Sequence, residues 1–109
     1  MSGPEAHTQR AILAAWGAHP RLRIARVNTG AAMLKGRLVR FGVPGTADIV
    51  GLIAPTGRLL MIEVKAAKGK QRDAQVVMQR VMTAFGGLYI VARSVADVDT
   101  ALAAIGITR

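Results

Sequence analysis

The sequence predicts an α/β protein whose main elements follow the order αβββαβα. Apolar residues recur at helical spacing in three separate stretches, and β-rich runs lie between these stretches. Turn signals that contain Gly, Pro or Asn mark most of the borders. A chain of 109 residues is long enough for one modest hydrophobic core, so residues 1–109 are expected to form a single domain without a repeat or a linker.

The first third of the chain predicts one helix and one strand. Pro4 suits a first helical turn, and an apolar stripe that includes Ile12 and Trp16 extends the predicted helix over about residues 4–17. The next run alternates apolar residues with arginines and predicts a strand at about 22–28 with one basic face. Residues 30–46 contain four glycines and a proline, and they support no more than a short strand near 37–41.

The middle of the chain predicts an antiparallel hairpin. Two β-rich runs, near 47–53 and 58–65, flank the turn signal Pro55-Thr56-Gly57. A further short apolar run at 88–92 predicts a buried strand.

Two more helices are expected in the second half. Asp73 is expected to cap the first of them, and Gly86-Gly87 is expected to end it. Its apolar stripe is made of Val77, Met78, Val81, Met82 and Phe85. Ser94 and Asp97 form a pair like a capping box in front of a last helix near 95–105.

The charge of the chain indicates a polyanionic partner. There are 15 Lys and Arg against 6 Asp and Glu, which gives a formal net charge of +9. Residues 21–47 contain no acid, and basic residues cluster there and again just after the predicted hairpin. The bases are Arg21, Arg23, Arg26, Lys35, Arg37 and Arg40, then Lys65, Lys68, Lys70 and Arg72. The alternative is that this charge serves solubility alone.

Several classes of protein are excluded by composition. The chain has no cysteine, so a disulfide framework and a thiolate zinc site are excluded. Its apolar runs are shorter than the roughly 20 residues of a membrane span, and its first residues lack the pattern of a secretory signal. A cytoplasmic protein without a membrane partner is therefore expected.

Two acids and a lysine fall close together in the predicted hairpin. Glu63 and Lys65 are two apart in one strand and therefore project from the same face. Asp48 lies near the start of the facing strand, so the three side chains are expected to meet at one edge. Two carboxylates suit Mg²⁺ or Mn²⁺, and a lysine beside them can orient or deprotonate an attacking water. Alternatively, Asp48 closes the turn at 44–45, and Glu63 and Lys65 form a solvated face or an ion pair.

The motifs Gly45-Thr46-Ala47-Asp48 and Glu63-Val64-Lys65, followed by Gln75 and Gly86-Gly87, resemble the VRR-NUC branch of the PD-(D/E)XK nucleases. The resemblance covers nearly the whole chain and is closest to the stand-alone phage and bacterial domains that resemble Holliday junction resolvases. It implies a restriction-endonuclease-like αβββαβ core, with a central mixed sheet flanked by helices and an added C-terminal helix. It also implies a metal-dependent DNA endonuclease.

The resemblance also assigns roles to residues. Asp48 and Glu63 become ligands of Mg²⁺ or Mn²⁺ together with the backbone carbonyl of Val64, Lys65 becomes the catalytic lysine, and Gln75 supports it. Glu5 corresponds to a first-helix glutamate that often faces the metal in the family. The alternatives are that Gln75 is an exposed first-turn residue and that Glu5 only favours the helix dipole. Ala47 replaces a frequent proline, which shapes the strand entry and binds no metal.

The expected substrate is DNA recognised by shape. So small a chain has little surface for reading a base sequence, which favours a four-way junction, with a flap or a nick next. The residues expected to bind DNA are Arg26, Lys35, Arg37, Arg40, Lys68, Lys70 and Arg72. Resolving a junction takes two symmetric cuts, which favours a homodimer. An apolar patch for the dimer interface could be formed by Met33, Leu34, Met78 and Met82. The alternative is that all four residues are interior. The alternative function is a non-catalytic nucleic-acid-binding module on the same fold.

Overall fold

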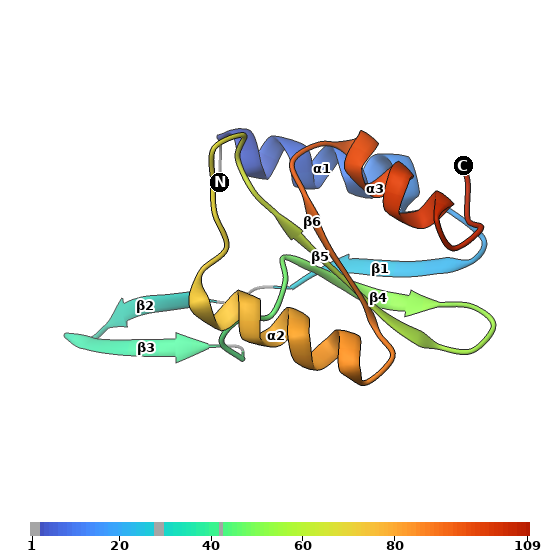
Figure 1. Cartoon of the computed structure of the whole chain (residues 1–109). Helices are drawn as coiled ribbons and strands as arrows, with labels where there is room; N and C mark the ends of the chain where they lie inside the picture. The colour runs from blue at the N-terminus through green and yellow to red at the C-terminus, as the bar shows by residue number, and fades with distance from the viewer. Residues whose placement is uncertain (1–2, 28–29, 42) are drawn as a thin grey trace.

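The computed structural model describes residues 3–27, 30–41 and 43–109 and confirms the predicted fold class (Figure 1). It is an α/β fold with a mixed sheet flanked by helices and a C-terminal helix. The elements in chain order are α1 (Pro4–Trp16), β1 (Leu22–Arg26), β2 (Gly30–Leu34), β3 (Arg37–Phe41), β4 (Ile49–Ile53), β5 (Arg58–Val64), α2 (Asp73–Ala84), β6 (Leu88–Ala92) and α3 (Val95–Ala103). None of the helices in these residues is long and apolar enough to cross a membrane.

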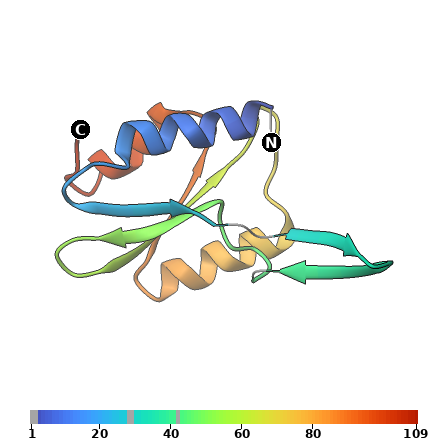
Figure 2. The same cartoon turned by 180° about the vertical axis from the view of Figure 1, so that it is seen from behind.

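The main sheet has four strands in the order β1-β4-β5-β6. β4 pairs antiparallel with β1 and β5, whereas β5 and β6 are parallel and are joined through α2. Helices α1 and α3 cover one face of this sheet, and α2 covers the other (Figures 1 and 2). This order is compatible with the αβββαβ core if β2 and β3 are an insertion between its first two strands.

The alternation of side chains along β5 builds a core on each face of the sheet. Leu60, Ile62 and Val64 are fully buried in the larger cluster, where they meet apolar residues of α1 and α3. Met61 points the other way, into a smaller cluster with Ala47 and Tyr89 beneath α2. Glu63 is two residues after Met61 in β5, so its side chain projects from the same face of the sheet, which is the face covered by α2.

Helix α1 has the expected core face. Ile12 and Trp16 are 0% and 1% exposed, and the indole Nε1 of Trp16 donates a hydrogen bond to Oδ1 of Asp99 at 2.9 Å. Nε2 of His19 lies 2.8 Å from the carbonyl oxygen of Thr108, so this histidine ties the end of α1 to the C-terminus.

Residues 30–41 contain one strand more than predicted. β2 and β3 form a separate two-stranded antiparallel sheet in which Leu34 pairs with Arg37. The strand β2 was missed because it begins Gly30-Ala31-Ala32, residues that are depleted in strands. Lys35 and Gly36 at the turn have φ values of 52° and 75°, as a two-residue type I′ hairpin turn requires.

Helix α2 differs from the prediction at its start and on its buried face. Arg72 is the N-cap, and Asp73 is the first helical residue, so the predicted Asp73 cap is wrong. Phe85 is 86% exposed and Val77 is 55% exposed, whereas Met78 packs against the smaller core. The stripe was wrong because apolar residues occupy two sides of this helix and only the side with the methionines meets the sheet.

The other end of α2 and the start of α3 agree with the prediction. Gly86 has a φ of 94°, and the N–H of Gly87 donates to the Met82 carbonyl at 2.8 Å, which ends α2 where expected. Ser94 is the N-cap of α3, and its Oγ accepts from the Asp97 N–H at 3.2 Å. The Asp97 carboxylate accepts from the Arg93 N–H at 2.8 Å.

Candidate active site

The hairpin of β4 and β5 brings Asp48 and Glu63 together. Ile49 pairs with Ile62, so Asp48, the residue before β4, lies opposite Glu63 near the end of β5. Oδ2 of Asp48 accepts a hydrogen bond from the backbone N–H of Val64 at 2.8 Å. This bond fixes the carboxylate of Asp48 against the strand that carries Glu63.

Glu63 is a buried carboxylate with one satisfied oxygen. Its side chain is 3% exposed, and Oε2 lies 3.4 Å from Nζ of Lys65, which is itself 11% exposed. Among the described residues, Oε1 of Glu63 is the buried side-chain oxygen that has no hydrogen-bond partner. A buried oxygen without a partner is costly in a folded protein.

The surroundings of Glu63 disfavour its charge. Burial and then the negative charge of Asp48 raise the pKa of this carboxyl, the ammonium of Lys65 opposes both effects, and the net pKa is about 7. The single positive charge of Lys65 therefore does not neutralise the negative charges of two carboxylates placed this close together. A site with this electrostatic imbalance favours an additional cation.

The residues fit a divalent cation of the Mg²⁺ type. The oxygen without a partner on Glu63, the carboxylate of Asp48 and the backbone carbonyl of Val64 are all hard oxygen donors. In residues 3–27, 30–41 and 43–109 no three His, Cys, Asp or Glu side chains form a group able to hold a metal. Asp48 and Glu63 supply two carboxylates, and Mg²⁺ commonly binds proteins through one or two carboxylates while it keeps several of its waters.

Glu5 is not brought into this group. It lies in the first turn of α1, where its side chain is exposed. The start of α1 does lie at the same end of the molecule as the loop 65–72 that follows β5 (Figure 1). A ligand role for Glu5 stays a prediction.

Gln75 is placed at the start of α2 with its side chain buried. It is 1% exposed, so the alternative of an exposed first-turn residue is wrong. Its Oε1 accepts a hydrogen bond from the backbone N–H of Arg72 at 2.8 Å, which stabilises the first turn of the helix. Gln75 thus supports the element that covers this face of the sheet.

Gly45 holds the loop before Asp48 against α2. Its φ is 85°, and a Cβ at this position would clash with the carbonyl oxygen of Ala74 and lie 3.2 Å from Cβ of Met78. Only glycine meets both demands without strain. The loop 43–47 therefore sits directly on the first turns of α2, which fixes how the chain enters Asp48.

Tyr89 of β6 is a residue of this site that the sequence analysis missed. It is 6% exposed, and its hydroxyl lies 3.4 Å from the carbonyl oxygen of Gly45, to which it donates. Burial raises the pKa of this phenol, and the negative charges of Glu63 and Asp48 raise it further, so the hydroxyl keeps its proton. The signal in the sequence was that the chain's one tyrosine stands within an apolar strand.

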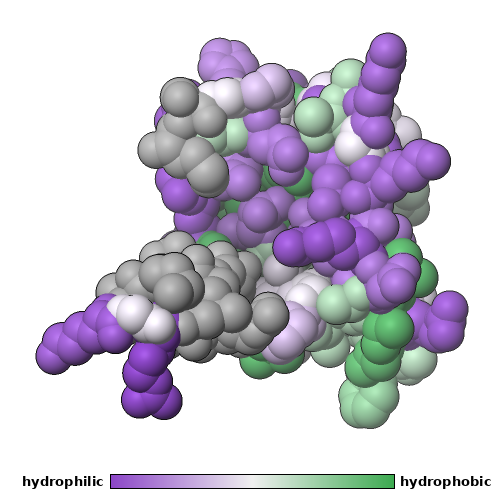
Figure 3. Space-filling model, turned by 90° about the vertical axis from the view of Figure 1, so that its left-hand side faces the viewer, coloured by the Kyte–Doolittle hydropathy of each residue, from purple (hydrophilic) through white to green (hydrophobic). Residues whose placement is uncertain are grey.

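The basic residues surround this end of the molecule. Hydrophilic side chains gather over the upper part of the face that shows the loop 65–72 and the start of α2, while apolar ones gather at its lower right (Figure 3). The predicted DNA contacts that are exposed are Arg26, Lys35, Arg37, Lys68, Lys70 and Arg72, while the side chain of Arg40 lies outside the described part of the structure. Arg93, which was not predicted, donates from Nη2 to the Gly69 carbonyl at 2.7 Å and so anchors the basic loop.

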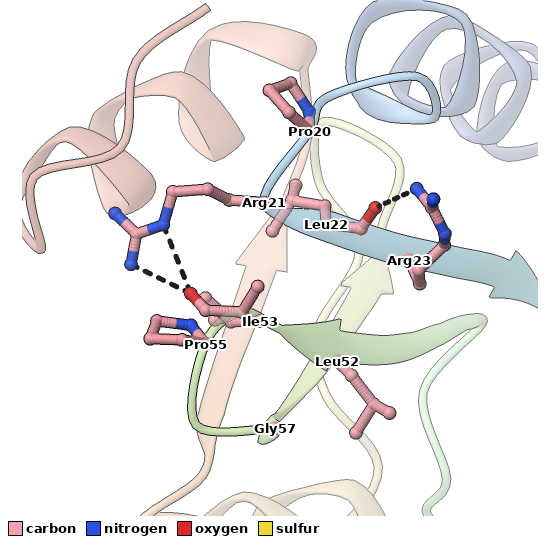
Figure 4. A pocket seen from close by; sticks show the side chains of 9 residues that line it. Pro20, Arg21, Leu22, Arg23, Leu52, Ile53, Pro55 and Gly57 are labelled. Carbon is pink, nitrogen blue, oxygen red and sulfur yellow. Dashed lines mark hydrogen bonds between the residues drawn. The ribbon is translucent and has the colours of Figure 1, made fainter.

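A cavity of about 310 Å³ lies at the opposite end of the strands, between the start of β1 and the turn from β4 to β5 (Figure 4). Nε and Nη2 of Arg21 both donate to the Ala54 carbonyl, at 3.1 and 3.0 Å. Leu52, at 51% exposed, lines the cavity. None of the residues that line it belongs to the group around Glu63.

No protein-family model matches the chain, and no curated protein matches its sequence.

Proposed function

We propose that this chain is a Mg²⁺- or Mn²⁺-dependent endonuclease that hydrolyses phosphodiester bonds in DNA. The observation that carries the proposal is the meeting of Asp48, Glu63 and Lys65 at one edge of the sheet, with a buried oxygen of Glu63 left without a partner. Basic side chains around this edge supply the positive surface that a nucleic acid requires.

Each group of the site has a distinct part in this chemistry. The carboxylates of Asp48 and Glu63, with the carbonyl of Val64, would hold the cation, and the hydrogen bond from the Val64 N–H keeps Asp48 oriented for this task. When bound, the cation polarises a phosphoryl oxygen and lowers the pKa of its water. Lys65, held 3.4 Å from Glu63, orients the attacking water and takes part in its deprotonation.

The substrate we propose is a branched DNA, with a four-way junction ahead of a flap or a nick. The exposed basic residues lie on several segments: the end of β1, the tip between β2 and β3, and the loop 65–72. Contacts of this kind go to phosphates and so respond to the shape of the DNA more than to its sequence.

Resolving a junction takes two cuts related by two-fold symmetry, so we also propose a homodimer. The structure changes the surface expected for it, because Met78 and Met82 are partly buried against the sheet, while the side chains of Met33 and Leu34 lie outside the described part of the structure. The outer side of α2 instead exposes Val77, Val81 and Phe85, at 55%, 40% and 86%. One patch on a single helix can be self-complementary, as a two-fold interface requires.

The test is cleavage of end-labelled junction, flap, nicked, duplex and single-stranded DNA side by side, with Mg²⁺, Mn²⁺ or a chelator. We expect metal-dependent cleavage with the junction cut fastest. Binding of these DNAs without cleavage in any metal would contradict the nuclease and support the non-catalytic binding module. Equal cleavage of all forms would contradict selectivity for DNA structure but would still support an endonuclease.

A further inference from the structure

The hairpin of β2 and β3, residues 30–41, is an arm that stands apart from the main sheet. Among the described residues its two strands pair only with each other. Figures 1 and 2 show it projecting beyond the start of α2, on the side of the molecule where the basic loop 65–72 also lies. An isolated two-stranded hairpin is marginally stable in water, so a long arm of this kind gains from a surface that it binds.

The base of the arm adjoins the candidate active site. The N–H of Val27 donates to the carbonyl oxygen of Asp48 at 2.8 Å. The chain therefore leaves the main sheet after β1, and returns to it before β4, next to Asp48, the proposed metal ligand. The arm therefore extends from the point where the proposed scissile phosphate would lie.

The tip of the arm is basic and exposed. Lys35, Gly36 and Arg37 are all exposed, and Gly36 completes the tight turn at a φ of 75°. No acid occurs between residues 21 and 47, so the charge of the arm is not balanced along the chain. A polyanion is the partner that fits this tip.

The dimensions of the arm fit the major groove of DNA better than the minor groove. Five residues per strand span about 16 Å at about 3.3 Å each. The major groove of DNA is about 12 Å wide and about 8.5 Å deep and admits a two-stranded ribbon, whereas the minor groove, about 6 Å wide, does not without deformation. We propose that the β2–β3 arm enters the major groove of the duplex that flanks the phosphodiester bond held at Asp48 and Glu63. This inference rests on the proposed function.

The first experiment tests the charge of the tip. Arg37→Ala is compared with Arg10→Ala, an exposed arginine of α1, with binding to a four-way junction measured in chelator over a range of salt concentrations. We expect Arg37→Ala to weaken binding and to reduce the slope of log affinity against log salt by about 1, with little change for Arg10→Ala. Equal slopes for the two variants would overturn the inference.

The second experiment tests the shape of the arm with its charge unchanged. Gly36→Val and Gly57→Val place a β-branched residue at φ values of 75° and 76°, in turns where an added Cβ meets nothing within 4 Å. The two variants carry the same local strain, but only the first alters the arm. We expect Gly36→Val alone to lose DNA affinity. Circular dichroism tests whether both variants are folded. Equal DNA affinity of the two folded variants would contradict the proposal that the arm binds DNA.

The third experiment identifies the groove. Dimethyl sulfate methylates guanine N7 in the major groove and adenine N3 in the minor groove. We expect the wild-type protein in chelator to protect guanine N7 beside the cutting position and leave adenine N3 reactive, and Gly36→Val to lose that protection. Protection of adenine N3 alone, or of neither atom, would overturn the major-groove assignment.

The experiments distinguish a failure of the proposed function from a failure of the proposal for the arm. A wild-type protein that binds none of the DNAs would overturn both the proposed function and the arm. A wild-type protein that binds and cleaves, with arm variants that behave like their controls, would overturn the arm alone.

Discussion

Nζ of Lys65 lies 3.4 Å from Oε2 of Glu63, while the other oxygen of the same carboxylate is buried without a partner. The lysine therefore pairs with one oxygen of the Glu63 carboxylate and leaves the other without a partner. The charge of Asp48 on the facing strand adds to the cost of ionising this carboxyl. This arrangement is poorly balanced as a structural ion pair and well suited to a bound cation.

The first prediction concerns catalysis. Asp48→Ala, Glu63→Ala and Lys65→Ala should each lower the cleavage rate by on the order of 100-fold or more, since each removes a group that we propose to act on the reacting atoms. Affinity for junction DNA should stay close to that of the wild type. Arg10→Ala, which changes an exposed arginine of α1, serves as the control and should retain the cleavage rate. Full cleavage by any of the three would remove that residue from the site.

The second prediction concerns pH. The pKa of Glu63 is raised to about 7 from an ordinary value of 4.5, so between these values the folded state holds a proton that the unfolded state has released. The contribution of Glu63 to the free energy of unfolding therefore falls as pH rises through this range. In chelator, Glu63→Gln should exceed the wild type in stability at pH 8, and the difference should shrink at pH 5.

The control for this prediction is Glu5→Gln, which changes an exposed glutamate. It removes one surface carboxylate, so a pH effect of the same size in this variant would mean that the effect is not specific to Glu63. A Glu63→Gln variant that is less stable than the wild type at pH 8, in chemical denaturation, would show that Glu63 is satisfied by contacts other than those described.

The third prediction concerns the metal. Mg²⁺ or Mn²⁺ at 100 times its dissociation constant should raise the free energy of unfolding by about 2.7 kcal/mol, because the cation binds the folded state alone. Asp48→Asn and Glu63→Gln should lose this increase in thermal denaturation. The same titration with Glu5→Gln decides the role of Glu5, because an unchanged metal affinity would exclude it as a ligand.

The fourth prediction concerns the loop that enters Asp48. Gly45→Ala and Gly57→Ala both place an alanine at a positive φ, 85° and 76°, but only at Gly45 would the new Cβ clash with the carbonyl of Ala74. The backbone strain alone costs about 1 kcal/mol. Gly45→Ala should therefore lower the melting temperature more than Gly57→Ala and should also slow cleavage. Equal losses of stability would show that the loop and α2 move apart freely.

The fifth prediction concerns assembly. Phe85→Asp should convert a dimer into a monomer in sedimentation experiments at micromolar concentration, because it places a charge within the exposed apolar side of α2. Ala14→Asp, an exposed position of α1, is the control and should leave the dimer intact. A wild-type protein that is monomeric both free and on junction DNA would contradict the dimer and favour flap or nick cleavage.

The sequence by itself determined the part of the site that is local in the chain. The turn at 55–57 and the two-residue alternation of strands were enough to place Asp48 opposite Glu63 and Lys65 on the same face as Glu63. The glycines at 86–87 likewise marked the end of α2, because a positive φ there needs glycine. In each case the determining interactions join residues that are close in sequence or paired across one tight turn.

Only the tertiary structure decided which groups surround that local site. Helical spacing gives the period of apolar residues but not which side of a helix meets the sheet, so α2 buries Gln75, packs Met78 partly buried against the sheet and leaves Phe85 exposed. Tyr89 reaches the carbonyl of Gly45 across 44 residues, a contact that exists only because β6 lies parallel to β5. The cost of charge on Glu63 also arises there, since desolvation depends on everything packed around a side chain and not on its neighbours in sequence.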